Sequence, residues 1–385
     1  MVARTAVVVG GGIGGLSAAV GLGRAGWDVT VLERVAVFQP VGAGLVLQAN
    51  GMRCLDALGL GDAVRAQGRP DMSGGARRAD GRWLARIPAD DLERVLGTSA
   101  IGVHRAALHD ILLSALPAGT VRTGARVSAV TADGAVTYES SAGPVHIGAD
   151  LVVAADGIHS FVRRSLWPEA AGPVHVGVRA WRGVTPVWDG DLVVAITWDR
   201  GAEFGIVPLV DGRVYWFAAV NAAPGGSAED TRIPARFLRW HHPIPALIAA
   251  TGAVLRDDLA CLDEPLPAYV RGRVALLGDA AHAMTPNLGQ GANQALEDAV
   301  VLAAVAGQPD GLAAYDSQRR PRTQQVAKAS RMIGRFGQQL ENPVAVAARN
   351  TLMHLIPPRL ALRSMAGYAD WHPPAPLARG GSFDA

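Results

Sequence analysis

The sequence predicts an α/β fold. A Rossmann-like, dinucleotide-binding domain with a parallel sheet is interleaved with a mostly antiparallel-sheet domain and followed by a C-terminal helical segment. Three observations support this prediction. A strand, a glycine-rich loop and a helix occupy residues 5–25. Strand-like runs without intervening helices fill residues 172–266. A buried strand and a second glycine-rich loop return at residues 274–293, so the first domain resumes after the second.

Composition limits the classes of function. The chain has 385 residues, of which 49% are hydrophobic, so it can bury a large core. A formal net charge of +2 does not indicate a nucleic-acid partner. The two cysteines, Cys54 and Cys261, form no CxxC pair, so we expect neither disulfides nor a metal site. We see no basic leader and no apolar run of the roughly 20 residues that a transmembrane helix needs, and we expect a cytoplasmic protein.

The first glycine-rich loop carries a dinucleotide signature. The apolar run from Thr5 to Gly10 predicts a buried strand, and GGGIGG then opens a helix. In the G-x-G-x-x-G pattern, Gly10 should form the tight turn, Gly12 should admit a pyrophosphate, and Gly15 should let the helix pack closely. Glu33, which ends the next strand, can accept hydrogen bonds from an adenosine ribose. An acid there predicts FAD or NAD rather than NADP.

The following segment mixes short elements. Gly42 and Gly44 indicate a mobile loop, and Asn50 is expected to cap a helix over residues 51–58. Asp-Gly pairs predict hairpin turns at residues 80–81 and 133–134. An amphipathic helix is expected from His104.

A buried strand over Leu151–Ala155 ends at Asp156–Gly157, before a helix expected near Ser160. An acid at the end of a strand can bind a nucleotide or a ribityl hydroxyl. An ordinary Asp-Gly turn is the alternative.

Residues 172–266 concentrate aromatic side chains on strand-like runs: Trp181, Trp198, Tyr215 and Trp216. These side chains fill a core or line a pocket on one face of an antiparallel sheet. The second loop follows a strand at Val274–Leu277, passes Gly278–Asp279, turns at Pro286–Asn287 and starts a helix near Gly289.

Together, the G-x-G-x-x-G loop, the Asp156–Gly157 pair and the stretch GDAAHAMTPNLGQGANQALEDA at residues 278–299 resemble the FAD-dependent aromatic hydroxylases. These are the single-component class A flavoprotein monooxygenases, such as para-hydroxybenzoate, salicylate and urate hydroxylases. The resemblance covers residues 4–335 and implies that each loop holds one end of FAD. It assigns FAD contacts to Gly10, Gly12, Gly14, Gly15, Glu33, Arg34, Gly44, Arg105, Val127, Asp156, Gly157, Asp279, Gly289, Gln290, Gly291, Ala292 and Asn293.

The helix after the second loop has a physical reason to face the flavin, because a helix N-terminus stabilises the negative charge of reduced flavin. The resemblance implies that NAD(P)H binds transiently and that the flavin moves to meet it. NADH and NADPH both remain open.

The catalytic candidates are Tyr215 and Pro286. By resemblance, Tyr215 hydrogen-bonds the substrate and Pro286 lines the flavin face. Trp181 and Arg182 are further candidates for lining the substrate pocket. A packed core tyrosine is the alternative for Tyr215, and His282 is expected to be structural.

Two positions depart from the urate hydroxylases. Glu203 stands near where they carry a substrate-anchoring arginine, and Asn287 stands where they carry an aspartate. A carboxylate at Glu203 would repel an anionic ring, so we expect a neutral phenolic, indolic or polyketide-like substrate.

The resemblance implies an NAD(P)H-dependent monooxygenase that inserts one oxygen atom from dioxygen into an aromatic or heteroaromatic molecule through a flavin hydroperoxide. A flavin-dependent epoxidase, a Baeyer–Villiger enzyme and a non-catalytic flavin-binding protein are the alternatives. A halogenase fits poorly, because the chain has no W-x-W-x-I-P motif and Lys328 is its sole lysine.

The predicted FAD-binding domain comprises residues 1–171 and 267–330, and the substrate domain residues 172–266. A hairpin at 72–88 is a candidate to join the substrate sheet, and residues 331–385 form a helical segment and tail. A monomer or a homodimer is expected.

Overall fold

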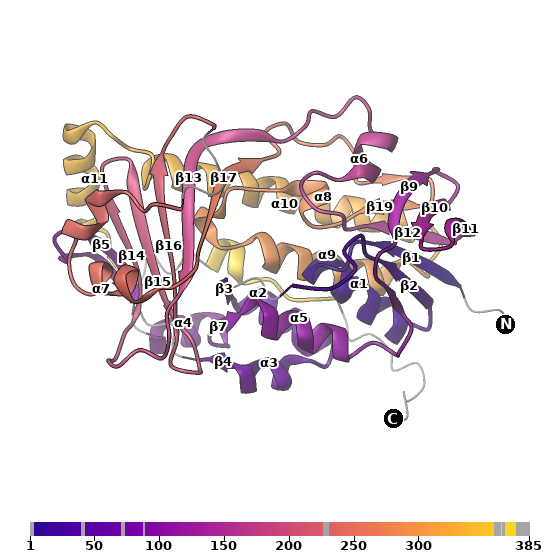
Figure 1. Cartoon of the computed structure of the whole chain (residues 1–385), viewed down its shortest axis with the longest axis horizontal. Helices are drawn as coiled ribbons and strands as arrows, with labels where there is room; N and C mark the ends of the chain where they lie inside the picture. The colour runs from indigo at the N-terminus through magenta and orange to yellow at the C-terminus, as the bar shows by residue number, and fades with distance from the viewer. Residues whose placement is uncertain are drawn as a thin grey trace.

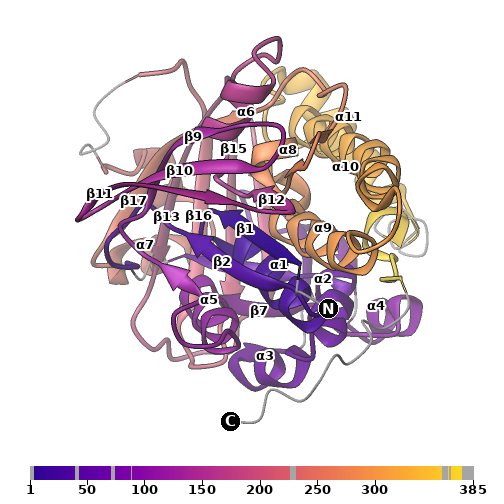
Figure 2. The ribbon, with the colours of Figure 1, turned by 90° about the vertical axis from the view of Figure 1, so that its right-hand side faces the viewer.

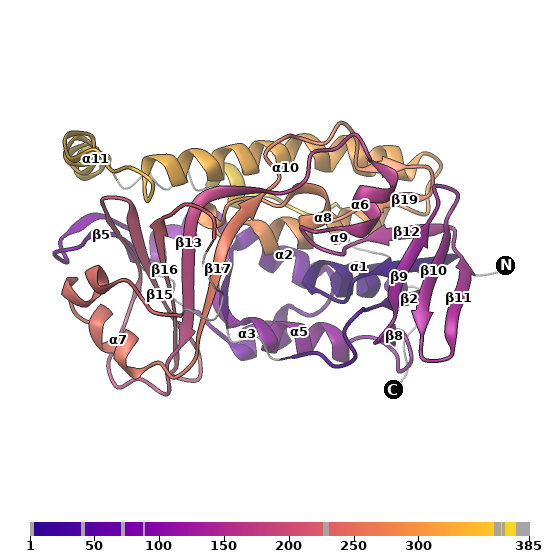
Figure 3. The same cartoon turned by 45° about the horizontal axis from the view of Figure 1, so that its top comes forward.

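The computed structural model describes residues 4–39, 43–70, 74–87, 89–225, 231–357, 363 and 366–374. Figure 1 shows an elongated molecule with one large sheet at each end. Helix α10 (Gly311–Phe336) extends lengthwise along the molecule and passes both large sheets, as Figure 3 shows from above. Its 26 residues correspond to a length of about 39 Å.

The first large sheet has six strands in the order β18-β19-β12-β1-β2-β8. Strands β19, β12, β1, β2 and β8 are parallel, and β18 is antiparallel to β19. This pairing confirms the predicted parallel sheet and brings distant parts of the chain together. The strands are β1 (Thr5–Val9), β2 (Asp28–Leu32), β8 (Val121–Arg122), β12 (Leu151–Ala154), β18 (Val270–Arg271) and β19 (Val274–Leu276).

Layers cover both faces of this sheet, as the end-on view in Figure 2 shows. A three-stranded antiparallel sheet lies on one side, and helices α1 and α9 lie on the other. Apolar side chains from all three layers share one buried core. The elements are β9 (Arg126–Val130), β10 (Ala135–Ser140), β11 (Gly143–Gly148), α1 (Ile13–Arg24) and α9 (Gly291–Val305).

A small group of elements packs beside α1 and α9 around a second core. It contains a three-stranded sheet of order β3-β7-β4 and short helices. The elements are β3 (Gly44–Leu47), β4 (Gly68–Arg69), β7 (Ile101–His104), α2 (Ala49–Ala57), α3 (Gly61–Gln67) and α5 (Arg105–Ser114), with α4 (Ala89–Leu96) nearby.

The second large sheet has seven strands in the order β17-β13-β16-β15-β14-β5-β6. All neighbours are antiparallel except β14 and β5. The β5–β6 hairpin comes from far earlier in the chain, and its expected place in this sheet is confirmed. The strands are β5 (Gly74–Arg78), β6 (Trp83–Ile87), β13 (Val174–Val184), β14 (Val194–Asp199), β15 (Ala202–Pro208), β16 (Val214–Asn221) and β17 (Val254–Cys261).

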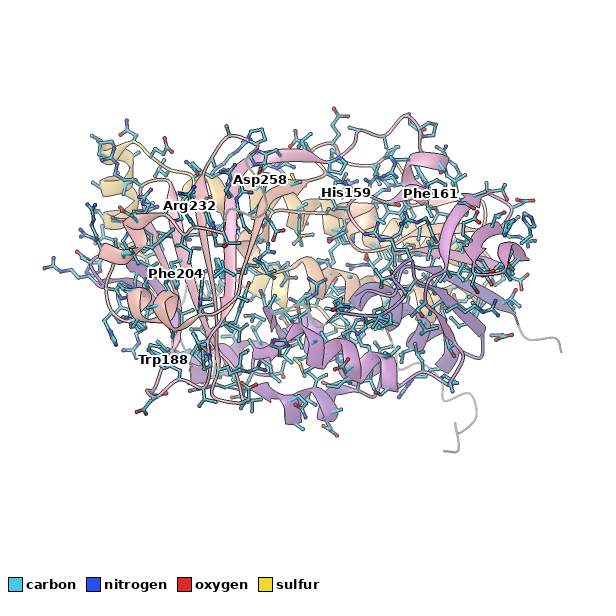
Figure 4. The ribbon with its side chains drawn as sticks, viewed as in Figure 1. His159, Phe161, Trp188, Phe204, Arg232 and Asp258 are labelled. Carbon is cyan, nitrogen blue, oxygen red and sulfur yellow. The ribbon has the colours of Figure 1, made fainter. Side chains whose placement is uncertain are left out.

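The two faces of this sheet differ because side chains alternate along each strand. Phe204, labelled in Figure 4, packs with Trp216 and Trp181 in a core on the outer face. Helices η1 (Ala235–Arg239) and α7 (Ile244–Ala250) complete this core. The other face, which carries Glu203 and Tyr215, is turned toward the rest of the molecule.

Three further short helices follow strands of the six-stranded sheet: α6 (Phe161–Leu166) comes after β12, and α8 (Asp279–His282) and η2 (Pro286–Leu288) come after β19. Helix α11 (Pro343–Leu355) follows α10. Helix α10 continues unbroken across residues 330 and 331. The proposed domain limits stay a prediction. No helix in the described part of the chain combines the length and apolar character needed to cross a membrane.

Two local expectations were wrong. Asn50 lies inside α2, and Gln48 is the N-cap residue, so the Asn50 side chain is free for other contacts. Gly44 begins strand β3 and is buried, rather than lying in an open loop. Gly42 lies outside the described residues.

Candidate active site

Parallel strands of the six-stranded sheet end together. The register pairs Val9 with both Leu32 and Ala154, and Ala154 with Leu276. The residues that follow these strand ends are therefore neighbours along one edge: Gly10, Glu33, Asp156 and Asp279. Ligands of open α/β sheets bind outside the carboxyl ends of the strands, so this edge is the candidate cofactor site.

The glycines of the first loop fit the roles expected for a pyrophosphate-binding turn. Gly10 has φ +106°, and a methyl group there would clash with the carbonyl oxygen of Ala155. A methyl group on Gly15 would clash with the carbonyl oxygen of Gly10, and one on Gly14 would lie 2.7 Å from Leu277. Gly12 differs, because nothing lies within 4 Å of the place where its methyl group would be. The loop is therefore tight on the protein side and open at Gly12.

The helix that follows offers its N-terminus at the same edge. Gly12 is the N-cap of α1, and no side chain caps its first turn. The carboxylate of Glu33 accepts hydrogen bonds from Gly11 N at 2.7 Å and Val35 N at 2.9 Å. Free helix N–H groups favour an anion such as a phosphate. The arrangement fits the ADP half of a dinucleotide.

Asp156 reaches the same edge from β12. Its Oδ2 accepts hydrogen bonds from Phe161 N at 2.7 Å and Val162 N at 3.1 Å, at the start of α6. Figure 4 labels Phe161 at this position. Its Oδ1 is buried and has no partner among the described residues. A buried acceptor without a partner is costly. A hydroxyl or N–H donor of a bound molecule would satisfy it.

The second loop presents backbone rather than side chains. Gly289 has φ +62°, and Gln290 is the buried N-cap of α9. The Asn293 side chain accepts from Gln48 N at 3.0 Å and donates to Gly289 O at 2.9 Å. It braces the loop against β3 and α2. This bracing holds the turn before α9 in place, and so fixes the direction of the backbone N–H groups at the start of that helix.

A buried polar network lies behind both turns of the second loop. Asp298 accepts from Gly278 N at 2.9 Å, His282 Nε2 at 2.6 Å and Arg319 Nε at 2.7 Å. Arg319 also pairs with Glu297, which accepts from Asn50 at 2.7 Å. Burial alone would raise the pKa of Asp298, but His282 and Arg319 lower it to about 2. The expectation that His282 is structural is confirmed.

The remaining predicted FAD contacts occupy less direct positions. Asp279 is exposed at the start of α8, and Arg34 is exposed just after β2. Arg105 begins α5, and its backbone N–H donates to Ala43 O at 2.9 Å. Val127 packs from β9 against the core of the six-stranded sheet. The other predicted contacts are Gly157, which has φ +80° beside Asp156, and Gly291 and Ala292 in the first turn of α9.

A cavity of about 210 Å³ lies between the seven-stranded sheet, η2 and the end of α10. Glu203 from β15 and Pro286 and Asn287 from η2 are in its wall. Val178 of β13 and Leu259 of β17 add apolar surface. The remaining lining side chains are mostly polar or charged, so the cavity combines a small apolar patch with many hydrogen-bonding groups. A concave site whose polar groups can orient a ligand is typical of small-molecule binding.

Glu203 is the buried acid of this cavity. Its side chain is 6% exposed, and Trp198 Nε1 donates to its Oε2 at 3.0 Å. Burial raises the pKa of Glu203 to about 7, and the bond from Trp198 opposes that rise in part.

The other substrate candidates are spread across the sheet. Tyr215 lies over Gly44, where a methyl group would be 2.6 Å from Cγ of the ring. Burial raises the pKa of Tyr215. Val207, paired with Tyr215, is four residues from Glu203 on β15, or about 13 Å along the strand. Tyr215 and Glu203 thus lie at opposite ends of one face.

Arg182 is on the same face and forms an ion pair with Asp257 at 2.7 Å. Trp181 does not lie on this face, contrary to the expectation that it lines the substrate pocket. It packs in the outer core, because β13 directs neighbouring side chains to opposite faces.

Sequence reasoning missed His175 as part of the cavity and Trp198 as the hydrogen-bond donor to Glu203. Trp198 is paired with Glu203 across the β14–β15 hairpin, so the turn between these strands was the available signal. His175 lines the cavity from the start of β13, and its Nε2 is buried without a partner among the described residues. Nothing in the local sequence marks it.

The fold and the site define a dinucleotide-binding protein with a separate small-molecule cavity. Comparisons with known proteins give its family. A family model described as an FAD binding domain matches residues 3–330. The chain is 37% identical over 364 residues to aurachin C monooxygenase/isomerase of Stigmatella aurantiaca, covering 91% of this chain and 94% of that protein. It is 35% identical over 342 residues to an FAD-dependent urate hydroxylase of Klebsiella pneumoniae, covering 85% and 88%.

Solved structures agree with the sequence comparisons. The crystal structure of Klebsiella pneumoniae HpxO complexed with FAD and uric acid superposes with a TM-score of 0.86 at 30% identity, covering 95% of this chain and 96% of that one. A salicylate hydroxylase substrate complex gives a TM-score of 0.73 at 26% identity, covering 97% and 99%. The chain belongs to the FAD-dependent aromatic hydroxylase family and is an enzyme of the monooxygenase type.

Proposed function

We propose that this enzyme inserts one oxygen atom from dioxygen into a neutral aromatic or heteroaromatic molecule, with NAD(P)H as the reductant. The balanced reaction is Ar–H + O₂ + NAD(P)H + H⁺ → Ar–OH + NAD(P)⁺ + H₂O. The observation that carries the proposal is the cavity at Pro286, because η2 directly precedes the loop and helix that present backbone N–H groups to a flavin. FAD bound there would accept a hydride and activate dioxygen.

The chain's own residues bind, orient and exclude water. The tight turn at Gly10 and Gly15 and the N-terminus of α1 bind the diphosphate. The unpartnered Oδ1 of Asp156 accepts a hydrogen bond from a hydroxyl group of the cofactor. Backbone N–H groups at the start of α9 stabilise negative charge on the ring system.

On the substrate side, Pro286 supports one face of the aromatic ring. Tyr215 provides a neutral hydroxyl at the far end of the sheet, because its pKa is raised by burial. Arg182 is less available to bind a substrate, because it already forms an ion pair with Asp257.

The test is NAD(P)H-dependent oxygen uptake by the FAD-loaded enzyme across phenols, indoles, quinolones and purines, with product masses recorded. A compound that accelerates uptake and gains one oxygen atom supports the proposal. Product structure by NMR separates ring hydroxylation from epoxidation and Baeyer–Villiger insertion. Failure of every compound to stimulate NAD(P)H oxidation would favour a non-catalytic flavin-binding role.

A test of the cofactor site compares FAD binding by Asp156→Asn with FAD binding by the control variant Asp150→Asn. Asp150 is a surface residue that accepts from Thr5 at the opposite end of β12. Asp156→Asn should weaken FAD binding, and Asp150→Asn should not.

A further inference from the structure

Glu203 is a buried carboxyl group for which the roles assigned above give no use. It sits in the cavity wall on β15, beside Pro286 and Asn287 of η2. No cationic side chain in the described ranges forms an ion pair with it. Burying an uncompensated carboxyl group costs free energy, so its presence at a substrate cavity calls for an explanation.

Only one oxygen of this carboxyl group is occupied. Trp198 Nε1 donates to Oε2 at 3.0 Å, whereas Oε1 accepts no hydrogen bond from any residue that the structure describes. Trp198 is itself fixed. A methyl group on Gly337 would lie 2.8 Å from its ring, and the Arg349 guanidinium lies 5.5 Å from the ring centroid. The carboxyl group is therefore held in one orientation with a free acceptor atom at the cavity.

We propose that Glu203 is the proton acceptor of the substrate site, and that the site takes a neutral ring whose reacting carbon is activated by an O–H or N–H group on that ring. This inference rests on the monooxygenase function proposed above. It assigns proton acceptance to Glu203, and leaves Tyr215 to hydrogen-bond the other end of the substrate.

The proton transfer balances as follows. The O–H or N–H bond of the substrate breaks, its proton goes to Oε1 of Glu203, and its electron pair spreads into the ring. The reacting carbon then forms its bond to one oxygen atom of dioxygen as the O–O bond breaks, and the other oxygen atom leaves as water with the two electrons that NAD(P)H supplies. That carbon loses its own proton to solvent, and Glu203 returns the first proton to the ring heteroatom, which restores the O–H or N–H group in the product. General base catalysis of this kind is worth on the order of 10²-fold or more in rate.

The other ionisable groups of the cavity wall come from the strands and the helix that pack around Glu203. They are His175 on β13, Cys261 at the end of β17, Asp263 beyond it, and Arg331 and Arg335 on α10. Arg331 is engaged by Asp263, and Arg335 is exposed.

Burial dominates the titration of Glu203, and raises its pKa to about 7. The group is therefore mostly protonated below pH 7 and mostly ionised above it. The proton-accepting form increases as the pH rises.

The experiment compares two probes on the FAD-loaded enzyme from pH 6 to pH 9. One is 2-methyl-4(1H)-quinolone, which is neutral and carries a ring N–H. The other is its N-methyl derivative, which lacks that proton. Hydroxylated product per NAD(P)H consumed is measured for the wild type, Glu203→Gln and the control Glu139→Gln on the distant strand β10. Probe-induced changes in the flavin absorbance give dissociation constants without turnover.

The expected result has three parts. Wild-type hydroxylation of the N–H probe rises through about pH 7, Glu203→Gln lowers it on the order of 10²-fold and removes the rise, and Glu139→Gln changes neither. Equal pH profiles for wild type and Glu203→Gln would overturn the assignment. Equal dissociation constants for the two probes, or binding of neither by the wild type, would overturn the substrate class.

The proposed function would fail differently. In that case no compound of the wider panel stimulates oxygen uptake by the wild type, whereas the binding comparison between the two probes can still be read.

Discussion

Gly12 is the glycine of the first loop whose methyl group would meet no protein atom. The other glycines of the motif would clash with the protein, so substituting them tests folding and binding together. Gly12→Ala should leave the stability of the apoprotein nearly unchanged and weaken FAD binding at least about tenfold, equivalent to ~1.4 kcal/mol. The cause is the methyl group, which would occupy the space left for the diphosphate. Fluorescence titration of the apoprotein with FAD measures this loss.

Gly23, in the same helix, is the control for that substitution. It is also open to a methyl group, but it lies far along α1 from the loop. Gly23→Ala should stabilise the helix by about 0.5–1 kcal/mol and leave the affinity for FAD unchanged. Equal losses of affinity in both variants would contradict the role assigned to Gly12.

Tyr215 allows a second single-residue test. Its hydroxyl takes part in no hydrogen bond recorded among the described residues, and its ring packs over Gly44. Tyr215→Phe keeps this packing and removes only the hydroxyl. We expect product formed per NAD(P)H to fall by about tenfold, while FAD affinity stays within about twofold.

Tyr269→Phe is the matched control for this variant. Tyr269 hydrogen-bonds Thr323 at 2.7 Å in a buried position away from the cavity. Losing that bond should lower the free energy of unfolding by about 1 kcal/mol. The amount of product formed per NAD(P)H should not change. Unchanged coupling in Tyr215→Phe would leave the tyrosine as a packed core residue.

For single residues, the sequence predicted those whose role depends on the conformation of the local backbone. Gly10 and Gly15 and the acids at strand ends follow from a motif with a known geometry. Trp181 and Trp198 could not be separated in the same way. Which of them lies on the sheet face that carries Glu203 depends on the register of β13 and β14, and a shift of one residue reverses every side chain of a strand.

Helices α9 and α10 are joined by buried ion pairs behind the second loop. Arg319 contacts both Glu297 and Asp298, and its side chain is 1% exposed. Arg319→Met should destabilise the protein by about 3 kcal/mol or more, because it removes the buried cation that compensates two buried carboxylates. Denaturant unfolding of the apoprotein measures the change.

The neighbouring arginine provides the comparison. Arg320 pairs with Asp316 one turn away at 3.0 Å, and its side chain is 32% exposed. Arg320→Met should cost less than about 1 kcal/mol. Similar losses for the two variants would show that the buried pairs add nothing beyond a surface contact.

Element boundaries were predictable where a start or stop signal stands in the sequence. Helix α6 begins next to Ser160 as expected, with Ser160 as its N-cap, and the hairpin between β9 and β10 turns at an Asp-Gly pair. The strand at Gly44 and the position of Asn50 were missed for a shared reason. Both depend on tertiary contacts, with Tyr215 in one case and with Glu297 and Gln290 in the other.

The relation of the two large sheets is set where the end of α10 meets β16. Asn221 donates to Gln339 O at 3.0 Å and accepts from Gln338 at 2.8 Å, and both glutamines line the cavity. Asn221→Ala should loosen this contact and admit water. We expect the fraction of NAD(P)H coupled to product to fall about two- to fivefold, a cost below ~1 kcal/mol, with hydrogen peroxide making up the difference.

Gln308→Ala serves as the control for Asn221→Ala. Gln308 is an exposed residue just beyond α9 that hydrogen-bonds Ala304 O, and it is not part of the cavity lining. It should leave coupling and FAD affinity unchanged. Full coupling in Asn221→Ala would mean that the joint between α10 and β16 does not influence the cavity.

The order of strands in the six-stranded sheet also has a consequence for biosynthesis. Strand β12 pairs with β1 on one side, but its other edge is covered by β19, more than a hundred residues later in the chain. At a synthesis rate of about 5–20 residues per second, β12 waits on the order of 6 to 24 s for β19 to leave the ribosome. During that interval the nascent chain exposes an apolar strand edge, of the kind that invites misassembly. The cofactor edge, which needs Asp279 as well as Gly10, is completed only afterwards, so FAD is expected to act late, as the ligand that locks a nearly finished chain.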